Sequence, residues 1–283
     1  MPVAVIRIGL DPVLFHLGPL SVHWYGLAYV AGIVAGLQAA FPFAARLGIN
    51  RDTAYQIFWP VLIGSLVGGR LYYVVQSDAG RYLRHPADIL ATWEGGMAFY
   101  GAVFLGAATA FVVCLIKRIS FPVVLDVAAV FIPVAQTFGR VGNLINGDIL
   151  GYPSTLPWAT QYTNPNNTFV PSHTIAYDPA AAYELLFSAL LFVVVWKLRD
   201  RFRVPGTPFT LWLVLYSAGQ FFLFFLRANS VVWLGLKQAQ LTAIVVVALA
   251  VPVWFAWRNW YRRADGNRTS PAVAGGTQSG ASA

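Results

Sequence analysis

Seven stretches of about 20 mostly apolar residues follow one another along the chain, and each is long enough to cross a bilayer as an α-helix. They are Val22–Ala44, Thr53–Gln76, Gly96–Ile116, Phe121–Val141, Pro179–Leu198, Thr207–Leu226 and Ala239–Trp260. A spanning segment must satisfy its own backbone polar groups, which a helix does. We therefore predict an all-α integral membrane protein whose seven transmembrane helices occupy residues 22–260.

The composition excludes the main classes of soluble protein. Charged residues make up only 11% of the chain, whereas a soluble domain carries about 25%. The lone cysteine, Cys114, cannot form an intramolecular disulfide. The four histidines show no metal-ligand spacing, so we predict neither a disulfide scaffold nor a metal site.

The distribution of Lys and Arg predicts the orientation in the membrane. Of 19 basic residues, twelve lie in the tail and in the loops after the first, third and fifth spans, and five lie on the opposite side. Cytoplasmic loops of membrane proteins are enriched in Lys and Arg. We therefore expect the N-terminus outside and the C-terminus in the cytoplasm. The same rule explains the net charge of +8 without a nucleic-acid partner.

Three segments lie outside the predicted spans. Residues 1–21 are interrupted by Pro12, Pro19 and Asp11, and we expect an external N-terminal arm. Residues 142–178 contain no Lys or Arg and are rich in Asn, Pro, Thr and aromatics, which indicates a small external cap between helices four and five. Residues 261–283 end in a run of Gly, Ala, Ser and Thr, so we expect a disordered cytoplasmic tail.

A polar, glycine-rich stretch at the outer end of the fourth span, Gly139–Gly151, is the best candidate for a site. On a helix, Gln136, Arg140 and Asn143 would share one face. A guanidinium beside amide donors suits a phosphate head group. Snorkelling or helix packing is the alternative for any single residue of this kind.

Two Gly-rich stretches, Gly64–Arg70 and Trp93–Gly101, and Tyr25 could line the same cavity. Arg70 ends the glycine-rich segment Gly64–Arg70, whose glycines could equally form a helix-packing face. Tyr25 lies in an aromatic cluster at the start of the first span and could offer its hydroxyl or belong to an interfacial belt. The residues alone predict an outward-facing anion site within reach of lipid, and no particular reaction.

Several ordered motifs resemble the prolipoprotein diacylglyceryl transferase family of bacterial inner membranes, over a similarity that runs from Asp11 to about Trp260. The most specific is the stretch Gly139–Gly151. The other matches are His23–Leu27, Gly68–Arg70, Gly95–Met97, Asp126 and Tyr183-Glu184. The family acts in the bacterial inner membrane, so the resemblance implies the same multi-pass location for this chain.

The resemblance implies the first step of lipoprotein modification. The family moves the diacylglyceryl group of phosphatidylglycerol to the thiol of the lipobox cysteine in a prolipoprotein signal peptide, and glycerol phosphate leaves. No metal or organic cofactor is implied. The implied catalytic residues are Arg140, Tyr25, Tyr100 and Asp148. The implied substrate-binding residues are Arg140, Asn143, Asn146, Gly151, Arg70 and Glu184.

The chain departs from the family pattern at positions that matter for this chemistry. Tyr100 stands where the family has histidine, and Asp148 stands where the signature has glutamate. In the sixth span, Gln220 and Phe224 replace an arginine and a glutamate. A tyrosine with a pKa near 10 is a poor general base at neutral pH. We therefore expect slow transfer unless neighbours such as Arg227 and Asp148 compensate.

Three functional interpretations follow. The first is an active, divergent transferase, and the second is a non-catalytic relative that binds phospholipid or a precursor protein. The third, an unrelated seven-span receptor or retinal protein, is disfavoured because Ala239–Trp260 contains no lysine for a Schiff base. We favour the transferase, because Arg140 with Asn143 and Asn146 is an odd set to retain by accident, although a retained lipid-binding pocket would explain these residues too.

Overall fold

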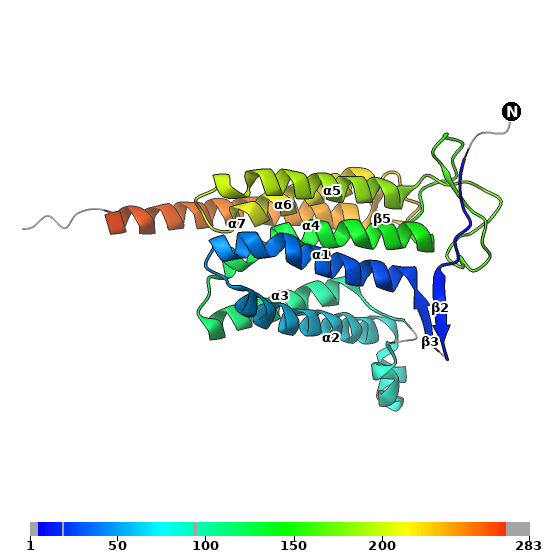
Figure 1. The fold of residues 1–283 in the computed structure, drawn as a ribbon, viewed down its shortest axis with the longest axis horizontal. Coiled ribbons are helices and arrows are strands. Elements are labelled where there is room, and N and C mark those ends of the chain that lie inside the picture. Colours follow the sequence, from blue (N-terminus) through cyan, green and yellow to red (C-terminus); the bar gives the residue numbers. More distant parts are fainter. Residues whose placement is uncertain (1–4, 19, 93–94, 270–283) are drawn as a thin grey trace, which may run out of the picture.

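The computed structural model describes residues 5–18, 20–92 and 95–269, and its α-helices run side by side along one axis (Figure 1). The helices are α1 (Trp24–Arg46), α2 (Arg51–Arg84), α3 (Phe99–Lys117), α4 (Phe121–Asn146), α5 (Ala180–Leu198), α6 (Thr207–Leu223) and α7 (Gln238–Thr269). Short strands are β1 (Ile6–Ile8), β2 (Val13–Leu17), β3 (Leu20–His23), β4 (Thr160–Tyr162), β5 (Val231–Trp233) and β6 (Leu236–Lys237). Two 3₁₀ turns are η1 (Pro86–Leu90) and η3 (Arg199–Arg201).

The predicted fold class, an all-α integral membrane protein, is confirmed. In the part of the chain that the structure describes, six helices, α1 to α5 and α7, are long and apolar enough to cross a membrane. Helix α6 has 17 residues, at the lower limit of about 17 for a span, and it packs against α4, α5 and α7. The count of seven spans therefore stays a prediction.

Two predicted segment boundaries are corrected by the helix ends. Helix α4 continues to Asn146 and ends where Gly147 adopts a left-handed conformation, so the first five residues of the predicted cap, 142–146, are helical. Helix α7 continues to Thr269, so the first part of the predicted tail 261–283 is helical as well. The remainder of that tail, 270–283, lies outside the described residues.

Helix α4 is the centre of the bundle, because α1, α5 and α6 all pack against it. A buried cluster joins these four helices through Ala40, Phe43, Ala129, Val130, Leu191, Val195 and Trp212. Helices α2 and α3 form a second close pair. A Cβ atom placed on Gly68 would lie 2.3 Å from the carbonyl oxygen of Gly101, so the packing role proposed for Gly68 fits the structure.

Asp126 has a structural role between two helices. Its carboxylate is buried and accepts hydrogen bonds from the backbone N–H groups of Gly206 (2.7 Å) and Phe209 (3.1 Å) at the start of α6. A carboxylate at a helix N-terminus satisfies free N–H groups and complements the helix dipole. Asp126 therefore joins α4 to α6.

The arm and the segment after α4 pack together at one end of the bundle (Figure 1). Strand β1 pairs with β4 in parallel, and β2 pairs with β3 as a hairpin. The hydroxyl of Tyr162 donates to the carbonyl of Leu144 (2.8 Å) and thereby fixes this segment to the end of α4. Burial raises the pKa of Tyr162 to about 12, which keeps the hydroxyl protonated and able to donate.

Candidate anion site

A three-residue ion cluster forms where α4, α5 and the segment after α6 meet. The carboxylate of Glu184, only 1% exposed, lies 2.7 Å from one guanidinium nitrogen of Arg140 and 3.0 Å from one of Arg227. Arg140 and Arg227 are 20% and 14% exposed. Two guanidinium groups thus share one buried carboxylate, and the cluster keeps an excess positive charge.

The Asn143 side chain extends the cluster along α4. Its Oδ1 atom accepts from Arg140 (3.0 Å), and its Nδ2 atom donates to the carboxylate of Asp148 (3.0 and 3.1 Å). Asp148 can reach back to the helix because the chain reverses at Gly147, where φ is +74°. The predicted shared face of Arg140 and Asn143 is therefore present, with Asp148 behind it.

Gly151 pairs with the backbone of Arg227 and so helps to place Arg227 in the ion cluster. The two residues form an isolated β-bridge, and the N–H of Ala228 donates to the carbonyl of Leu150 (3.1 Å). A Cβ atom placed on Gly151 would lie 2.5 Å from Cβ of Asp178 and 2.8 Å from the carbonyl oxygen of Leu226. Only glycine lets these backbones approach so closely.

Tyr25 is the predicted aromatic residue that does lie beside the cluster. Helix α1 approaches α4 closely here, since a Cβ atom placed on Gly142 would lie 3.1 Å from Cα of Tyr25. The Tyr25 hydroxyl donates to the hydroxyl of Tyr29 (3.1 Å). Asp148 and Arg140 are its charged neighbours. The structure thus brings Tyr25, Asp148 and Arg140 together.

Tyr216 was missed by the sequence analysis. It lies on α6, and Arg140 and Glu184 are its charged neighbours. Its position four residues before the buried Gln220 could have indicated a polar face on α6. Within the described residues, buried polar atoms without a hydrogen-bond partner also gather on α4, α5 and α6 and in the segment after α6. They include Gln136 Oε1, Ser188 Oγ, Gln220 Nε2 and Arg227 Nε.

Arg70 occupies a different environment. All five N–H donors of a guanidinium meet backbone carbonyls here, namely those of Asp88, Ile89, Ala91, Gly95 and Gly96. Arg70 is 7% exposed and holds the loop between α2 and α3. The structure therefore favours a structural role for Arg70 over the predicted contact with substrate, because no donor is left for a head group.

Tyr100, expected to assist proton transfer, and Asn146, expected to hold the head group, bond to other residues. The Tyr100 hydroxyl is 2.8 Å from the hydroxyl of Thr242, which joins α3 to α7. Asn146 is the last residue of α4, and its carbonyl accepts from Asn167 (3.2 Å). Neither residue has a recorded hydrogen bond to the cluster among the described residues.

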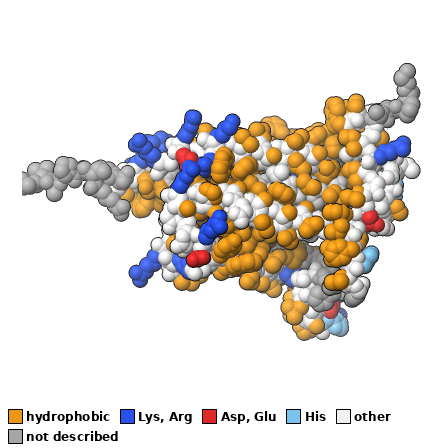
Figure 2. Space-filling model, in the orientation of Figure 1, with side chains coloured by type: hydrophobic (Ala, Val, Ile, Leu, Met, Phe, Trp, Pro, Cys, Tyr) orange, Lys and Arg blue, Asp and Glu red, His pale blue; other side chains and the backbone are white. Residues whose placement is uncertain are grey.

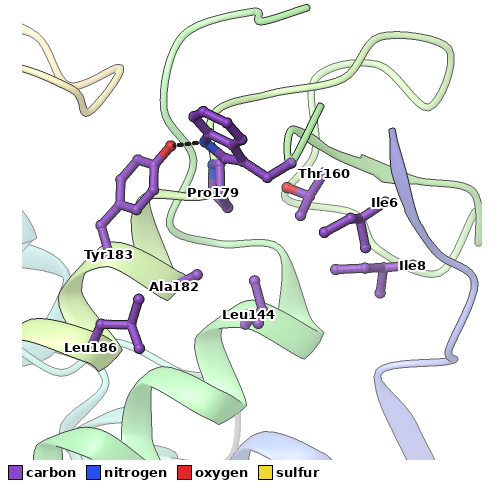
Figure 3. A pocket seen from close by; sticks show the side chains of 9 residues that line it. Ile6, Ile8, Leu144, Thr160, Pro179, Ala182, Tyr183 and Leu186 are labelled. Carbon is purple, nitrogen blue, oxygen red and sulfur yellow. Dashed lines mark hydrogen bonds between the residues drawn. The ribbon is translucent and has the colours of Figure 1, made fainter. Parts of the chain in front are cut away.

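An apolar cavity of about 400 Å³ lies between β1, β4 and the ends of α4 and α5 nearest the strands (Figure 3). Leu144 and Tyr183, which line it, directly follow Asn143 and precede Glu184 in the sequence. The Tyr183 hydroxyl accepts from Trp158 (2.8 Å). An amphipathic molecule therefore meets charged and apolar surfaces on the same two helices.

The arrangement can bind an anion and stabilise negative charge. Arg140 uses only two of its five donors for Asn143 and Glu184, so donors remain for a ligand. Guanidinium groups form paired hydrogen bonds with phosphate oxygens, and a largely buried site strengthens them. Among the described residues, no three His, Cys, Asp or Glu side chains gather as a metal site.

Comparison with known proteins places the site in a family context. The model of the family described as prolipoprotein diacylglyceryl transferase matches residues 12–256. A phosphatidylglycerol–prolipoprotein diacylglyceryl transferase of Cupriavidus metallidurans is 35% identical over 271 residues, covering 90% of this chain and 95% of that protein. Proteins of the same name are similar from Geobacter sulfurreducens (36% identity; 77% and 82% covered) and Staphylococcus saprophyticus (32%; 89% and 91%).

Proposed function

The chain belongs to the prolipoprotein diacylglyceryl transferase family, and on that premise we propose that it transfers the diacylglyceryl group of phosphatidylglycerol to a prolipoprotein cysteine. The observation that carries the proposal is the ion cluster of Arg140, Glu184 and Arg227, whose three side chains carry a net charge of +1 and unused donors, while α4 and α5 also line an apolar cavity. A phosphodiester with aliphatic chains matches both surfaces.

The chemical step needs charge stabilisation on the leaving group. The acceptor sulfur forms a bond to the glyceryl carbon that carries the phosphate, the C–O bond breaks, and glycerol phosphate leaves with the electron pair on its oxygen. Arg140 and Arg227 face that developing charge with guanidinium donors. Such preorganised donors typically contribute about 10²–10³ in rate each.

Gln220 stands where the family has an arginine, and Arg227 can supply the second cation in its place. Arg227 comes from the segment after α6 and contacts Oε1 of Glu184, whereas Arg140 contacts Oε2. The expected compensation by Arg227 thus has a geometric basis. We propose that both guanidinium groups contact the phosphate.

The thiol must lose its proton, because the thiolate is the nucleophile. Of the residues predicted to assist, Asp148 and Tyr25 lie beside Arg140, whereas Tyr100 bonds to Thr242. We propose that the Asp148 carboxylate takes up this proton and that Tyr25 orients the acceptor cysteine. We also propose that the acceptor is the lipobox cysteine of a signal peptide entering from the membrane.

The proposed location is the bacterial inner membrane, with the cap and the N-terminus outside and the C-terminus in the cytoplasm. Figure 2 supports this orientation, because Lys and Arg side chains gather at the end of the bundle opposite the strands. This is the pattern expected when that end faces the cytoplasm.

The test uses purified protein in phosphatidylglycerol vesicles with a peptide that carries a lipobox cysteine. We expect a peptide mass increase equal to one diacylglyceryl group, resistant to hydroxylamine as a thioether is. A peptide with serine in place of the cysteine and vesicles of phosphatidylcholine alone are the controls. Binding of phosphatidylglycerol without any product would instead establish the non-catalytic alternative.

A further inference from the structure

Lys237 is a buried cation outside the ion cluster. It ends β6, directly before α7, and is only 5% exposed. Its Nζ atom donates to the carbonyls of Phe224 (2.6 Å) and Arg227 and to the hydroxyl of Tyr152 (3.2 Å). An ammonium group has three donors, and here each has one neutral acceptor. No carboxylate pairs with Lys237 within the described residues.

These contacts hold the end of α6. The helix ends at Leu223, and its last carbonyls have no partner within the helix. A cation at a helix C-terminus is favoured by the helix dipole. Gln240 adds to the effect, since its Oε1 accepts from the N–H of Lys237 (2.9 Å) and its Nε2 donates to the carbonyl of Phe221 (3.0 Å). The start of α7 therefore fixes the segment after α6.

The backbone of Arg227 is held from two sides. Gly151 bridges to it from the cap, and the Lys237 ammonium bonds its carbonyl. The guanidinium of Arg227 is thereby placed 3.0 Å from Glu184. The segment is not part of any helix. The N–H groups of Phe225 and Leu226 bond back to α6, and beyond them the contacts with Gly151 and Lys237 hold the backbone of Arg227.

We propose that Lys237 is a positioning residue for Arg227: its ammonium group anchors the carbonyl of Arg227 and so fixes the second guanidinium over the phosphate of the lipid donor. The inference rests on the proposed function, because the role of Arg227 does. Lys237 does not touch the substrate in this arrangement. Its effect passes through Arg227 alone and leaves the thiol acceptor untouched.

The test is a double-mutant cycle between Lys237→Met and Arg227→Ala, with Lys117→Met as the matched control because Lys117 bonds Gln56 near the other end of the bundle. We expect Lys237→Met to lower kcat/KM for phosphatidylglycerol by about 10–100-fold, the range for a lost charge-assisted contact. The KM for the peptide should not change. In the Arg227→Ala background, Lys237→Met should change kcat/KM by less than about twofold.

An equal loss in both backgrounds would overturn the proposal, since Lys237 would then act independently of Arg227. If Lys237→Met fails to fold, Lys237→Gln keeps two N–H donors and enters the same cycle. Binding of phosphatidylglycerol vesicles is measured on every variant. If the parent chain binds lipid without transfer, the proposed function fails, yet the cycle on the binding constant still tests the coupling between Lys237 and Arg227.

Discussion

Replacing Glu184 with glutamine should change stability and lipid affinity in opposite directions. The carboxylate is 1% exposed and lies between two guanidinium groups, at 2.7 Å and 3.0 Å. A glutamine side chain has the same shape but only one acceptor oxygen, so its amide N–H groups would face one of the two arginines. Both guanidinium groups would also lose their only anionic partner in the cluster core.

The change in stability and the change in lipid affinity both arise from the negative charge of Glu184. Removing one partner of a buried ion pair typically costs about 3–5 kcal/mol of stability, because uncompensated charge stays buried. The same carboxylate repels an incoming phosphate. For a phosphate about 8 Å from Glu184, at an effective dielectric constant of about 20, the repulsion is about 2 kcal/mol. Its removal corresponds to roughly 30-fold tighter binding.

Thermal unfolding in detergent and binding to phosphatidylglycerol vesicles measure the two effects. Asp200→Asn is the control, because the Asp200 carboxylate is half-exposed and loss of its ion pairs with Arg46 and Arg199 should change stability by less than about 1 kcal/mol. Weaker lipid binding by Glu184→Gln, in protein shown to be folded, would refute the reasoning. Glu184 would then orient the guanidinium groups more than it competes for them.

Three other perturbations test separate parts of the fold. Arg70→Lys removes several donors to the loop carbonyls and should raise protease cleavage of residues 85–96, at a cost of about 1–3 kcal/mol for each carbonyl left unpaired, while lipid binding by the folded protein is unchanged. Gly68→Leu should lower the unfolding temperature strongly, because even a Cβ atom would lie 2.3 Å from a backbone oxygen of α3. Reporter fusions after Arg201 and within Asn164–Ser172 should report cytoplasm and outside, respectively, and the reverse result would invert the orientation.

The spans could be predicted because the apolar runs are long and nearly uncharged. The beginning of α4 at Phe121 agrees with the prediction, but its end at Asn146 does not. The helix continues there through polar residues. The Asn143 side chain donates to Asp148, and the backbone carbonyl of Asn146 accepts from Asn167 in the cap. Hydropathy cannot show where such partners will be. The same limit applies to α7, whose last turns are basic but still helical.

The site was predictable only where its residues are close in sequence. Arg140 and Asn143 share a face because they are three residues apart. The pairing of Glu184 with Arg227 spans 43 residues and depends on the glycine contact at Gly151, which only the fold reveals. The role of Arg70 could not be predicted from the sequence. A buried arginine that donates to backbone carbonyls and one that binds a ligand look the same in a sequence.

The most direct test of the two-guanidinium site is the transfer rate of Arg140→Ala and Arg227→Ala, measured in phosphatidylglycerol vesicles with a lipobox peptide. If both groups stabilise the departing phosphate, each variant should lose about 10²–10³ in kcat. Arg46→Ala, an exposed arginine paired with Asp200, should stay within about twofold of the parent. Parental turnover by the folded Arg227→Ala variant would contradict the account, because Arg140 would then act without the second cation.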